Sequence, residues 1–224
     1  MEQLIRNMVE NVAERIAHER EYLDELDSRI GDGDFGTNLH RGSQAALRAV
    51  DDADDTTPSE LVSTVGQTLL EEVGGSSGVL LGMSLQAASS ELEAHDTGDG
   101  VVTFAETYRS EIEDRGDVSI GEKTMFDVVV PVVDVLRAST RTDSSPAEVS
   151  GRALEAARRG VMYTSELEAQ RGRASYTELR SVGRPDPGAV GTYIILEEIH
   201  ETIQSRTGER VSPSLSDGFD PDTK

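Results

Sequence analysis

Apolar side chains recur along the chain at three- and four-residue intervals, the spacing of one face of an α-helix. The first series, formed by Leu4, Ile5, Met8, Val12 and Ile16, predicts an amphipathic helix over residues 2–28. Further helices are predicted over residues 39–50, 58–73, 79–92, 103–114, 123–140, 146–170 and 188–205. No strand is predicted, since even the run Val128–Val130 is followed by Pro131, which a strand interior resists.

Eight helices without a strand indicate an all-α fold, and we expect them to pack as one closed bundle over residues 1–205. Aromatic residues make up only 4% of the chain, so the core is predicted to consist of Leu, Val, Ile, Ala and Met. Residues 206–224 contain two prolines and little to bury, and they are predicted to form a disordered acidic tail.

The charge of the chain excludes several classes of function. Its 224 residues include 43 Asp and Glu against 21 Lys and Arg, a net charge of −22. Nucleic-acid and anionic-membrane binding both need a basic face, so neither is expected. The absence of Cys excludes disulfides and thiolate metal sites. The mixed start Met1–Arg6 lacks a signal-peptide pattern, and no apolar run approaches the roughly 18 residues of a membrane helix, so a soluble, cytoplasmic protein is predicted.

The acidic residues are spread over the whole chain, and only Lys123 and Lys224 are lysines. A charge of −22 repels itself strongly in dilute salt, whereas near 1 M salt the Debye length falls to about 3 Å. This composition predicts a cytoplasm of high salt, with an ordinary acidic protein as the alternative.

Three carboxylates, Asp27, Asp32 and Asp34, lie within eight residues and are joined by Gly31 and Gly33. Glycine lets the backbone turn back tightly, so the turn can bring the carboxylates together. Clustered carboxylates repel one another unless a hard cation such as Mg²⁺ neutralises them. An EF-hand is excluded, because its twelfth position counted from Asp32 is a serine. The loop predicts a metal pair that holds a polyphosphate, with an Asx turn at a helix end as the structural alternative.

Two other loops carry groups suited to phosphate. The stretch Gly74–Gly78, Gly-Gly-Ser-Ser-Gly, can expose backbone N–H groups at the start of a helix. A later loop contains Arg171, Arg173, Arg180 and Arg184 before the turn Asp186-Pro187-Gly188. Arginine matches phosphate oxygens bidentately, so this loop is a candidate phosphate clamp. Ordinary solvated loops are the alternative in both cases.

Residues 116–124, Gly-Asp-Val-Ser-Ile-Gly-Glu-Lys-Thr, have some of the letters of a P-loop. Glu122 precedes the lysine, and a helix rather than a strand comes before the loop, so the P-loop interpretation is rejected. Lys123 is still a candidate cation near a helix start, with an ordinary surface lysine as the alternative.

Taken in order, these motifs resemble the nucleotide-binding L subunits of dihydroxyacetone kinase, the DhaL family. The motifs are Leu26-Asp27, Gly31–Asn38, Gly74–Gly78, Gly121–Met125, and Gly172–Tyr176 with Asp186–Gly188. The resemblance covers residues 1–205. It implies a closed barrel of eight antiparallel helices with the nucleotide at one end.

The resemblance also implies roles for individual residues. Asp27, Asp32 and Asp34 would hold two Mg²⁺ ions that bridge the phosphates of ADP or ATP. The nucleotide-binding positions would be Phe35, Gly36, Thr37, Asn38, Ser76, Ser77, Gly116, Met125, Arg173, Asp186, Pro187 and Gly188. The two serines would meet the phosphates, Gly116 and Met125 would border the adenine, and Arg173 with residues 186–188 would close over the nucleotide. Phe35 departs from the family, which often has His there.

Members of the family act with partners, which the resemblance implies for this chain. Dihydroxyacetone would be bound covalently by a His of a separate K subunit, and a phosphohistidine on an M subunit would rephosphorylate ADP held as a coenzyme. This chain would then supply positioning and charge neutralisation, with no catalytic side chain of its own. The alternatives are an ATP-dependent kinase, for dihydroxyacetone or a related acceptor, with freely exchanging nucleotide, and a non-enzymatic acidic helical module. A homodimer is left open.

Overall fold

The described chain is helical. The computed structural model describes residues 1–54, 56–94, 98–172, 174–175 and 181–208, and over these the chain forms nine helices and no strand. The helices are α1 (Glu2–Ser28), α2 (Phe35–Asp51), α3 (Pro58–Glu72), α4 (Gly75–Ser89), α5 (Glu91–Ala94), α6 (Gly98–Gly116), α7 (Phe126–Ser139), α8 (Pro146–Glu166) and α9 (Pro187–Thr207). Eight of them are long, and α5 is a single turn between α4 and α6.

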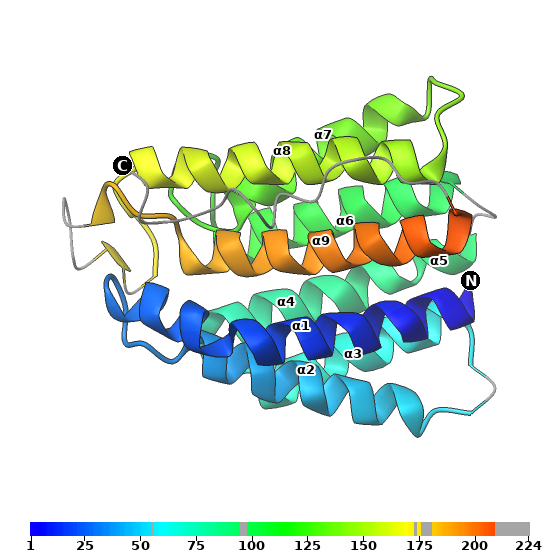
Figure 1. Ribbon diagram of the computed structural model, residues 1–224, viewed down its shortest axis with the longest axis horizontal. Coiled ribbons are helices and arrows are strands. Elements are labelled where there is room, and N and C mark those ends of the chain that lie inside the picture. Colours follow the sequence, from blue (N-terminus) through cyan, green and yellow to red (C-terminus); the bar gives the residue numbers. More distant parts are fainter. Residues whose placement is uncertain (55, 95–97, 173, 176–180, 209–224) are drawn as a thin grey trace.

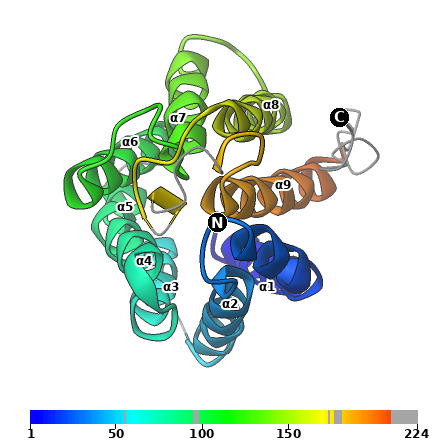
Figure 2. The same cartoon turned by 90° about the vertical axis from the view of Figure 1, so that its left-hand side faces the viewer.

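The long helices run up and down and form a ring (Figures 1 and 2). Each packs against the next, and α9 packs against both α8 and α1, which closes the ring. The predicted closed antiparallel bundle of eight main helices is therefore confirmed. Because the helices alternate in direction, the connections α1–α2, α3–α4, α6–α7 and α8–α9 all lie at one end of the bundle, on the left of Figure 1. That end is called the loop end below.

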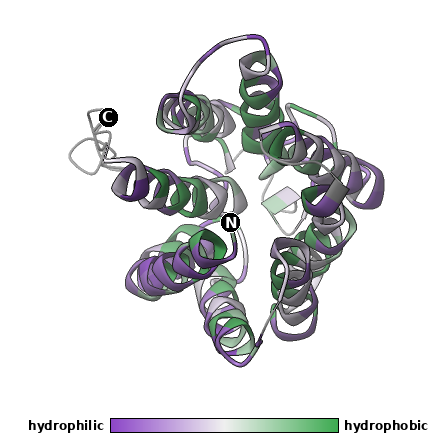
Figure 3. Cartoon of the chain, turned by 90° about the vertical axis from the view of Figure 1, so that its right-hand side faces the viewer, coloured by the Kyte–Doolittle hydropathy of each residue, from purple (hydrophilic) through white to green (hydrophobic). Residues whose placement is uncertain are grey.

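The core lies between the helices and is mainly aliphatic, as predicted. Buried side chains include Ile16 and Leu23 of α1, Val128 of α7 and Ile194 of α9, with Phe126 as an aromatic member. Figure 3 shows hydrophobic residues turned toward the inside of the ring and hydrophilic residues toward the outside. None of the described helices is both long and apolar enough to cross a bilayer.

The starts of α3 and α8 follow from sequence, and both lie at the end opposite the loop end. Thr57 accepts a hydrogen bond from the Glu60 N–H, and the Glu60 carboxylate accepts one from the Thr57 N–H at 2.8 Å. Ser145 and Glu148 form the same capping box at α8. The two boxes satisfy backbone donors that a helix start leaves without partners.

Several predicted helix boundaries were wrong. Helix α2 starts at Phe35 rather than 39, α4 at Gly75 rather than 79, and α6 at Gly98 rather than 103, so each start includes glycines that were expected to lie in a loop. Gly36 allows close approach of two helices, since a Cβ there would lie 2.1 Å from the Arg20 carbonyl oxygen of α1. Helix α7 starts at 126 rather than 123, α8 ends at 166 rather than 170, and α9 reaches 207. Residues 209–224 of the predicted tail lie outside the described residues.

A pair of glycines sets the contact between α3 and α4. A Cβ on Gly82 would lie 2.6 Å from the Gly66 carbonyl oxygen, so the two backbones touch. We expect Gly82→Ala to lower the free energy of unfolding by about 1–3 kcal/mol, the usual cost of overpacking. Gly98→Ala is the matched control, since a Cβ there would meet nothing within 4 Å. Thermal unfolding followed by circular dichroism at constant KCl checks this, and equal midpoints for the two variants would contradict it.

Candidate functional site

Three carboxylates converge at the loop end. Asp27 lies on the last turn of α1, Asp32 lies in the connection, and Asp34 is the N-cap residue of α2. One oxygen from each lies within 4.8 Å of the others, and the side chains of Asp32 and Asp34 are exposed to solvent. The turn thus brings together the carboxylates that the glycine spacing was expected to join. Such a set of oxygen ligands suits Mg²⁺ or another hard cation.

Asp27 also holds the turn in shape. Its Oδ2 accepts hydrogen bonds from the N–H groups of Gly33 at 2.8 Å and Asp34 at 3.1 Å. A Cβ on Gly31 would lie 2.1 Å from Asp27 Oδ1, and Gly33 has a φ of +76°, which favours glycine. Both glycines are therefore required by the path of the backbone around the Asp27 carboxylate.

Asp24 is part of the site, and the sequence analysis missed it. Its two carboxylate oxygens accept hydrogen bonds from the Thr37 N–H at 2.8 Å and the Thr37 hydroxyl at 2.6 Å. A carboxylate from α1 thereby satisfies a backbone donor in the first turn of α2. Residues three apart share one helix face, so the position of Asp24 relative to Asp27 was the available signal.

The predicted nucleotide-contacting residues of α2 lie in its first turn rather than in a loop. The Phe35 ring packs against α9, where a Cβ on Gly191 would lie 3.0 Å from it. The Asn38 side chain lies beside the α3–α4 connection, with its Oδ1 3.9 Å from the position of a Cβ on Gly74. Ser76 and Ser77 are in the first turn of α4, next to this connection, although their side chains lie outside the described part of the chain.

Met125, Asp186 and Gly188 lie together on the other side of the loop end. Asp186 caps α9 through a 2.8 Å hydrogen bond from the Ala189 N–H. A Cβ on Gly188 would lie 3.0 Å from Asp186 Oδ2 and 3.7 Å from the Cβ of Met125, so the starts of α7 and α9 lie close together. Gly116 ends α6, close to the Leu80 side chain of α4. Pro187 is buried in the first turn of α9, and Arg173 lies outside the described residues.

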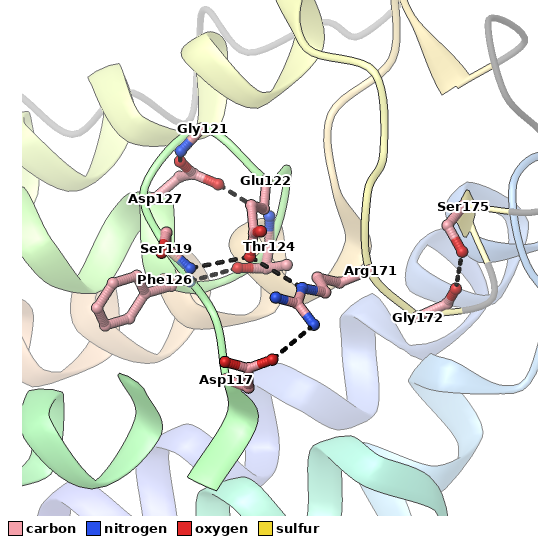
Figure 4. Close-up of polar contacts among 10 residues, drawn as sticks. All are labelled: Asp117, Ser119, Gly121, Glu122, Thr124, Phe126, Asp127, Arg171, Gly172 and Ser175. Atoms are coloured by element: carbon pink, nitrogen blue, oxygen red, sulfur yellow. Dashed lines mark hydrogen bonds and ion pairs between the residues drawn. The ribbon is translucent and has the colours of Figure 1, made fainter. Parts of the chain in front are cut away.

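A polar network stiffens the α6–α7 connection (Figure 4). Buried Asp127 accepts hydrogen bonds from the N–H groups of Gly121 at 2.5 Å and Thr124 at 2.9 Å. Glu122 accepts one from the Ser119 N–H at 2.9 Å. The network therefore fixes the backbone that leads to Met125, and Asp127 is another contributor that the sequence analysis missed.

Arg171 joins this network to the α8–α9 connection. Its Nε lies 3.0 Å from Glu122 Oε2, and a terminal nitrogen lies 3.3 Å from Asp117 Oδ2 (Figure 4). The Arg171 guanidinium thus pairs with two carboxylates of the α6–α7 connection, and the role of this loop as a phosphate clamp stays a prediction. The ion pairs bridge two connections of the loop end.

The electrostatics of the loop end favour a bound cation. Burial raises the pKa of Asp186 to about 7, against the opposing effects of the Ala189 N–H and the Lys123 charge. The negative charges of Asp127 and Asp27 raise it further. A cation bound at Asp27 would relieve the repulsion between Asp27 and Asp186.

The sequence of the chain matches a known protein family. The DAK2 domain family matches residues 29–201 of the chain. The chain belongs to this family. It is 34% identical over 190 residues to the ADP-binding subunit DhaL of PEP-dependent dihydroxyacetone kinase 1 from Listeria innocua, a match that covers 84% of this chain and 90% of the relative. The corresponding Escherichia coli subunit is 33% identical over 86% of this chain and 93% of its own length.

Longer relatives contain a comparable segment. Human triokinase/FMN cyclase is 31% identical over 88% of this chain, which spans 35% of that protein. The dihydroxyacetone kinase of C. freundii, solved in complex with AMP-PNP and Mg²⁺, superposes with a TM-score of 0.71 at 24% identity. That match covers 89% of this chain and 34% of the C. freundii chain, and it shows that the two share a fold.

Proposed function

We propose that this chain is the nucleotide-binding subunit of a dihydroxyacetone kinase and that it holds ADP or ATP at the loop end of the bundle. The observation that carries the proposal is the cluster of Asp27, Asp32 and Asp34 at that end. The family and the near-complete coverage of bacterial DhaL subunits support it. The C. freundii enzyme, which shares the fold, was solved with AMP-PNP and Mg²⁺.

The donor set fits magnesium. Mg²⁺ takes carboxylate and phosphate oxygens and keeps several waters, and the exposed Asp32 and Asp34 leave room for both. We assign Asp27, Asp32 and Asp34 as ligands of two Mg²⁺ ions, which would neutralise the charge that develops on a transferring phosphoryl group. Asp27 would have a second role, since it also holds the turn through the Gly33 and Asp34 N–H groups.

The nucleotide would lie between the two sides of the loop end. Phe35, Gly36, Thr37 and Asn38 would line it, Ser76 and Ser77 would meet its phosphates, and Gly116, Met125, Arg173 and Asp186–Gly188 would enclose the rest. Backbone N–H groups in the first turns of α2 and α4 favour anions, which suits a diphosphate. These residues position the nucleotide, and the chain supplies no catalytic side chain.

The acceptor and the donor would come from partner subunits. Dihydroxyacetone would be presented by a K subunit, and an M subunit carrying phosphohistidine would rephosphorylate ADP in place. The relatives support this form, because the L. innocua and E. coli proteins are ADP-binding subunits of PEP-dependent kinases. An ATP-dependent kinase with exchanging nucleotide is the second candidate, since the C. freundii dihydroxyacetone kinase that shares the fold was solved with AMP-PNP.

One experiment tests both forms. The chain is purified in high KCl with Mg²⁺, denatured, and the released nucleotide is identified by chromatography. We expect stoichiometric ADP that survives gel filtration, and dihydroxyacetone phosphate formation once K and M partners and a phosphoryl donor are added. ADP that is lost on the column while ATP supports turnover would favour the exchanging kinase. No binding of either nucleotide would contradict the proposal.

A further inference from the structure

Lys123 is buried at the loop end, whereas its sequence context was also consistent with an ordinary surface lysine. Only 1% of the surface of Lys123 is exposed. Its backbone has a φ of +61°, a conformation that residues other than glycine rarely adopt. The Nζ donates hydrogen bonds to the carbonyl oxygens of Thr164, on the last turn of α8, and Arg184, shortly before α9. A single ammonium group thus joins the α6–α7 connection to both ends of the α8–α9 connection.

Burial and two nearby carboxylates have opposite effects on the charged form of Lys123. Burial lowers the pKa of Lys123 to about 8, while the carboxylates of Asp186 and Asp127 oppose this change. Asp127 holds the backbone of the α6–α7 connection, and Asp186 caps α9. The ammonium group is therefore subject to the charges of the two carboxylates that shape the starts of α7 and α9.

Thr164 extends the contact toward the nucleotide side. Its hydroxyl accepts a hydrogen bond from the Asp186 N–H at 3.0 Å, while its carbonyl oxygen accepts from Lys123. Met125 follows Lys123 by two residues and lies beside Gly188. Moving Lys123 would therefore displace Met125 and residues 186–188 together, which are the positions assigned above to one side of the nucleotide.

We propose that Lys123 is a positioning residue for the nucleotide, whose ammonium group clamps the carbonyls of Thr164 and Arg184 and so fixes the starts of α7 and α9 against each other. The inference rests on the proposed function, because it assigns the clamped residues to nucleotide binding. It needs no contact between Lys123 and the nucleotide.

The opposite end of the bundle offers a matched control. Arg6 of α1 donates to the carbonyl oxygens of Val50 and Ala53, the latter at 2.7 Å, and so clamps the end of α2. Arg6→Met removes the same kind of contact far from the proposed site. A change that acts only through stability should appear in both variants, whereas a positioning effect should appear in Lys123→Met alone.

The test measures two ligands separately at constant KCl. Isothermal titration calorimetry gives the affinity for Mg·ADP, and electron paramagnetic resonance gives the binding of Mn²⁺ alone to the aspartate cluster. For Lys123→Met we expect Mg·ADP affinity to fall roughly tenfold or more, with Mn²⁺ affinity within about twofold of wild type. For Arg6→Met we expect a lower unfolding midpoint with both affinities within about twofold of wild type. Lys123→Arg should recover part of the lost ADP affinity, because it keeps the cation.

If the Lys123→Met variant folds and binds Mg·ADP as tightly as the wild-type protein, the proposed positioning role of Lys123 is wrong, while the proposed function stands. Wild-type chain that binds no Mg·ADP would instead contradict the proposed function, and the inference with it. If Lys123→Met does not fold, amine acylation of the wild-type chain followed by mass spectrometry decides. Lys123 should react roughly tenfold more slowly in the native chain than in denaturant, and Mg·ADP should slow it further. An acylation rate that Mg·ADP leaves unchanged would overturn the proposal.

Discussion

Replacing Asp32 by Asn is expected to abolish magnesium-dependent ADP binding. Asn has nearly the same shape but no charge, so a metal would lose one of three clustered anionic ligands. The loss should at least match the roughly 10- to 100-fold that removal of a mere outer-sphere partner costs. Asp27, rather than Asp32, accepts the Gly33 and Asp34 N–H groups, so these hydrogen bonds of the turn survive. Calorimetric titration with ADP, with and without Mg²⁺, measures the effect.

Asp51→Asn is the matched control for this change. Asp51 is exposed on the last turn of α2, at the end of the bundle opposite the cluster, and the substitution removes the same single charge. Any effect of net charge on ADP, which is itself an anion, would appear in both variants. Equal Mg·ADP affinity for Asp32→Asn and Asp51→Asn would refute the assignment of Asp32 as a metal ligand.

The aspartate turn was accessible from sequence because the determinants are local. Five residues between positions 27 and 34 carry both the carboxylates and the glycines, and the glycines can be recognised from the need for a tight turn. Steric contact at Gly31 and the positive φ of Gly33 agree with that interpretation. The closed helical fold was accessible for a similar reason, since helical periodicity repeats over the whole chain.

The first turn of α2 was misassigned because its stability depends on tertiary contacts. The stretch Gly36–Asn38 looks like a loop from composition, yet Asp24 on α1 binds both donors of Thr37 and thereby extends the helix backwards to Phe35. Helix α1 lies so close to residue 36 that only glycine fits at this position. Neither contact can be read from the spacing of residues within α2.

The environment of Lys123 was also out of reach of the sequence. Its partners are carbonyl groups of Thr164 and Arg184, which lie 41 and 61 residues further along the chain. Every residue has a backbone carbonyl oxygen, so the residue types at positions 164 and 184 do not indicate that these carbonyls bind a lysine. The ion pairs of Arg171 with Glu122 and Asp117 were likewise not predictable, since these partners lie 49 and 54 residues earlier in the chain.

Gly31→Ala is expected to impair metal binding without removing any carboxylate. The new Cβ would lie 2.1 Å from Asp27 Oδ1, a separation that no pair of unbonded atoms tolerates, so the Asp27 side chain or the turn must shift. We expect a loss in Mg·ADP affinity of roughly tenfold or more, because the ligand atoms must stay close to their productive geometry. Helical content should persist, since residue 31 lies outside the helices. Gly98→Ala, which meets no atom within 4 Å, serves again as the control.

A double-mutant cycle shows whether Gly31 acts through Asp27. Asp27→Asn is combined with Gly31→Ala, and the Mg·ADP affinities of the wild-type, single and double variants are compared at constant KCl. In the Asp27→Asn background the side chain at position 27 no longer supplies an anionic ligand, so displacing it has little further effect on the metal. Gly31→Ala should therefore lower Mg·ADP affinity far less in this background than in the wild-type protein. Equal and additive losses would show instead that the alanine acts on another part of the turn, and the close approach of Gly31 to Asp27 would then have no role in holding the metal.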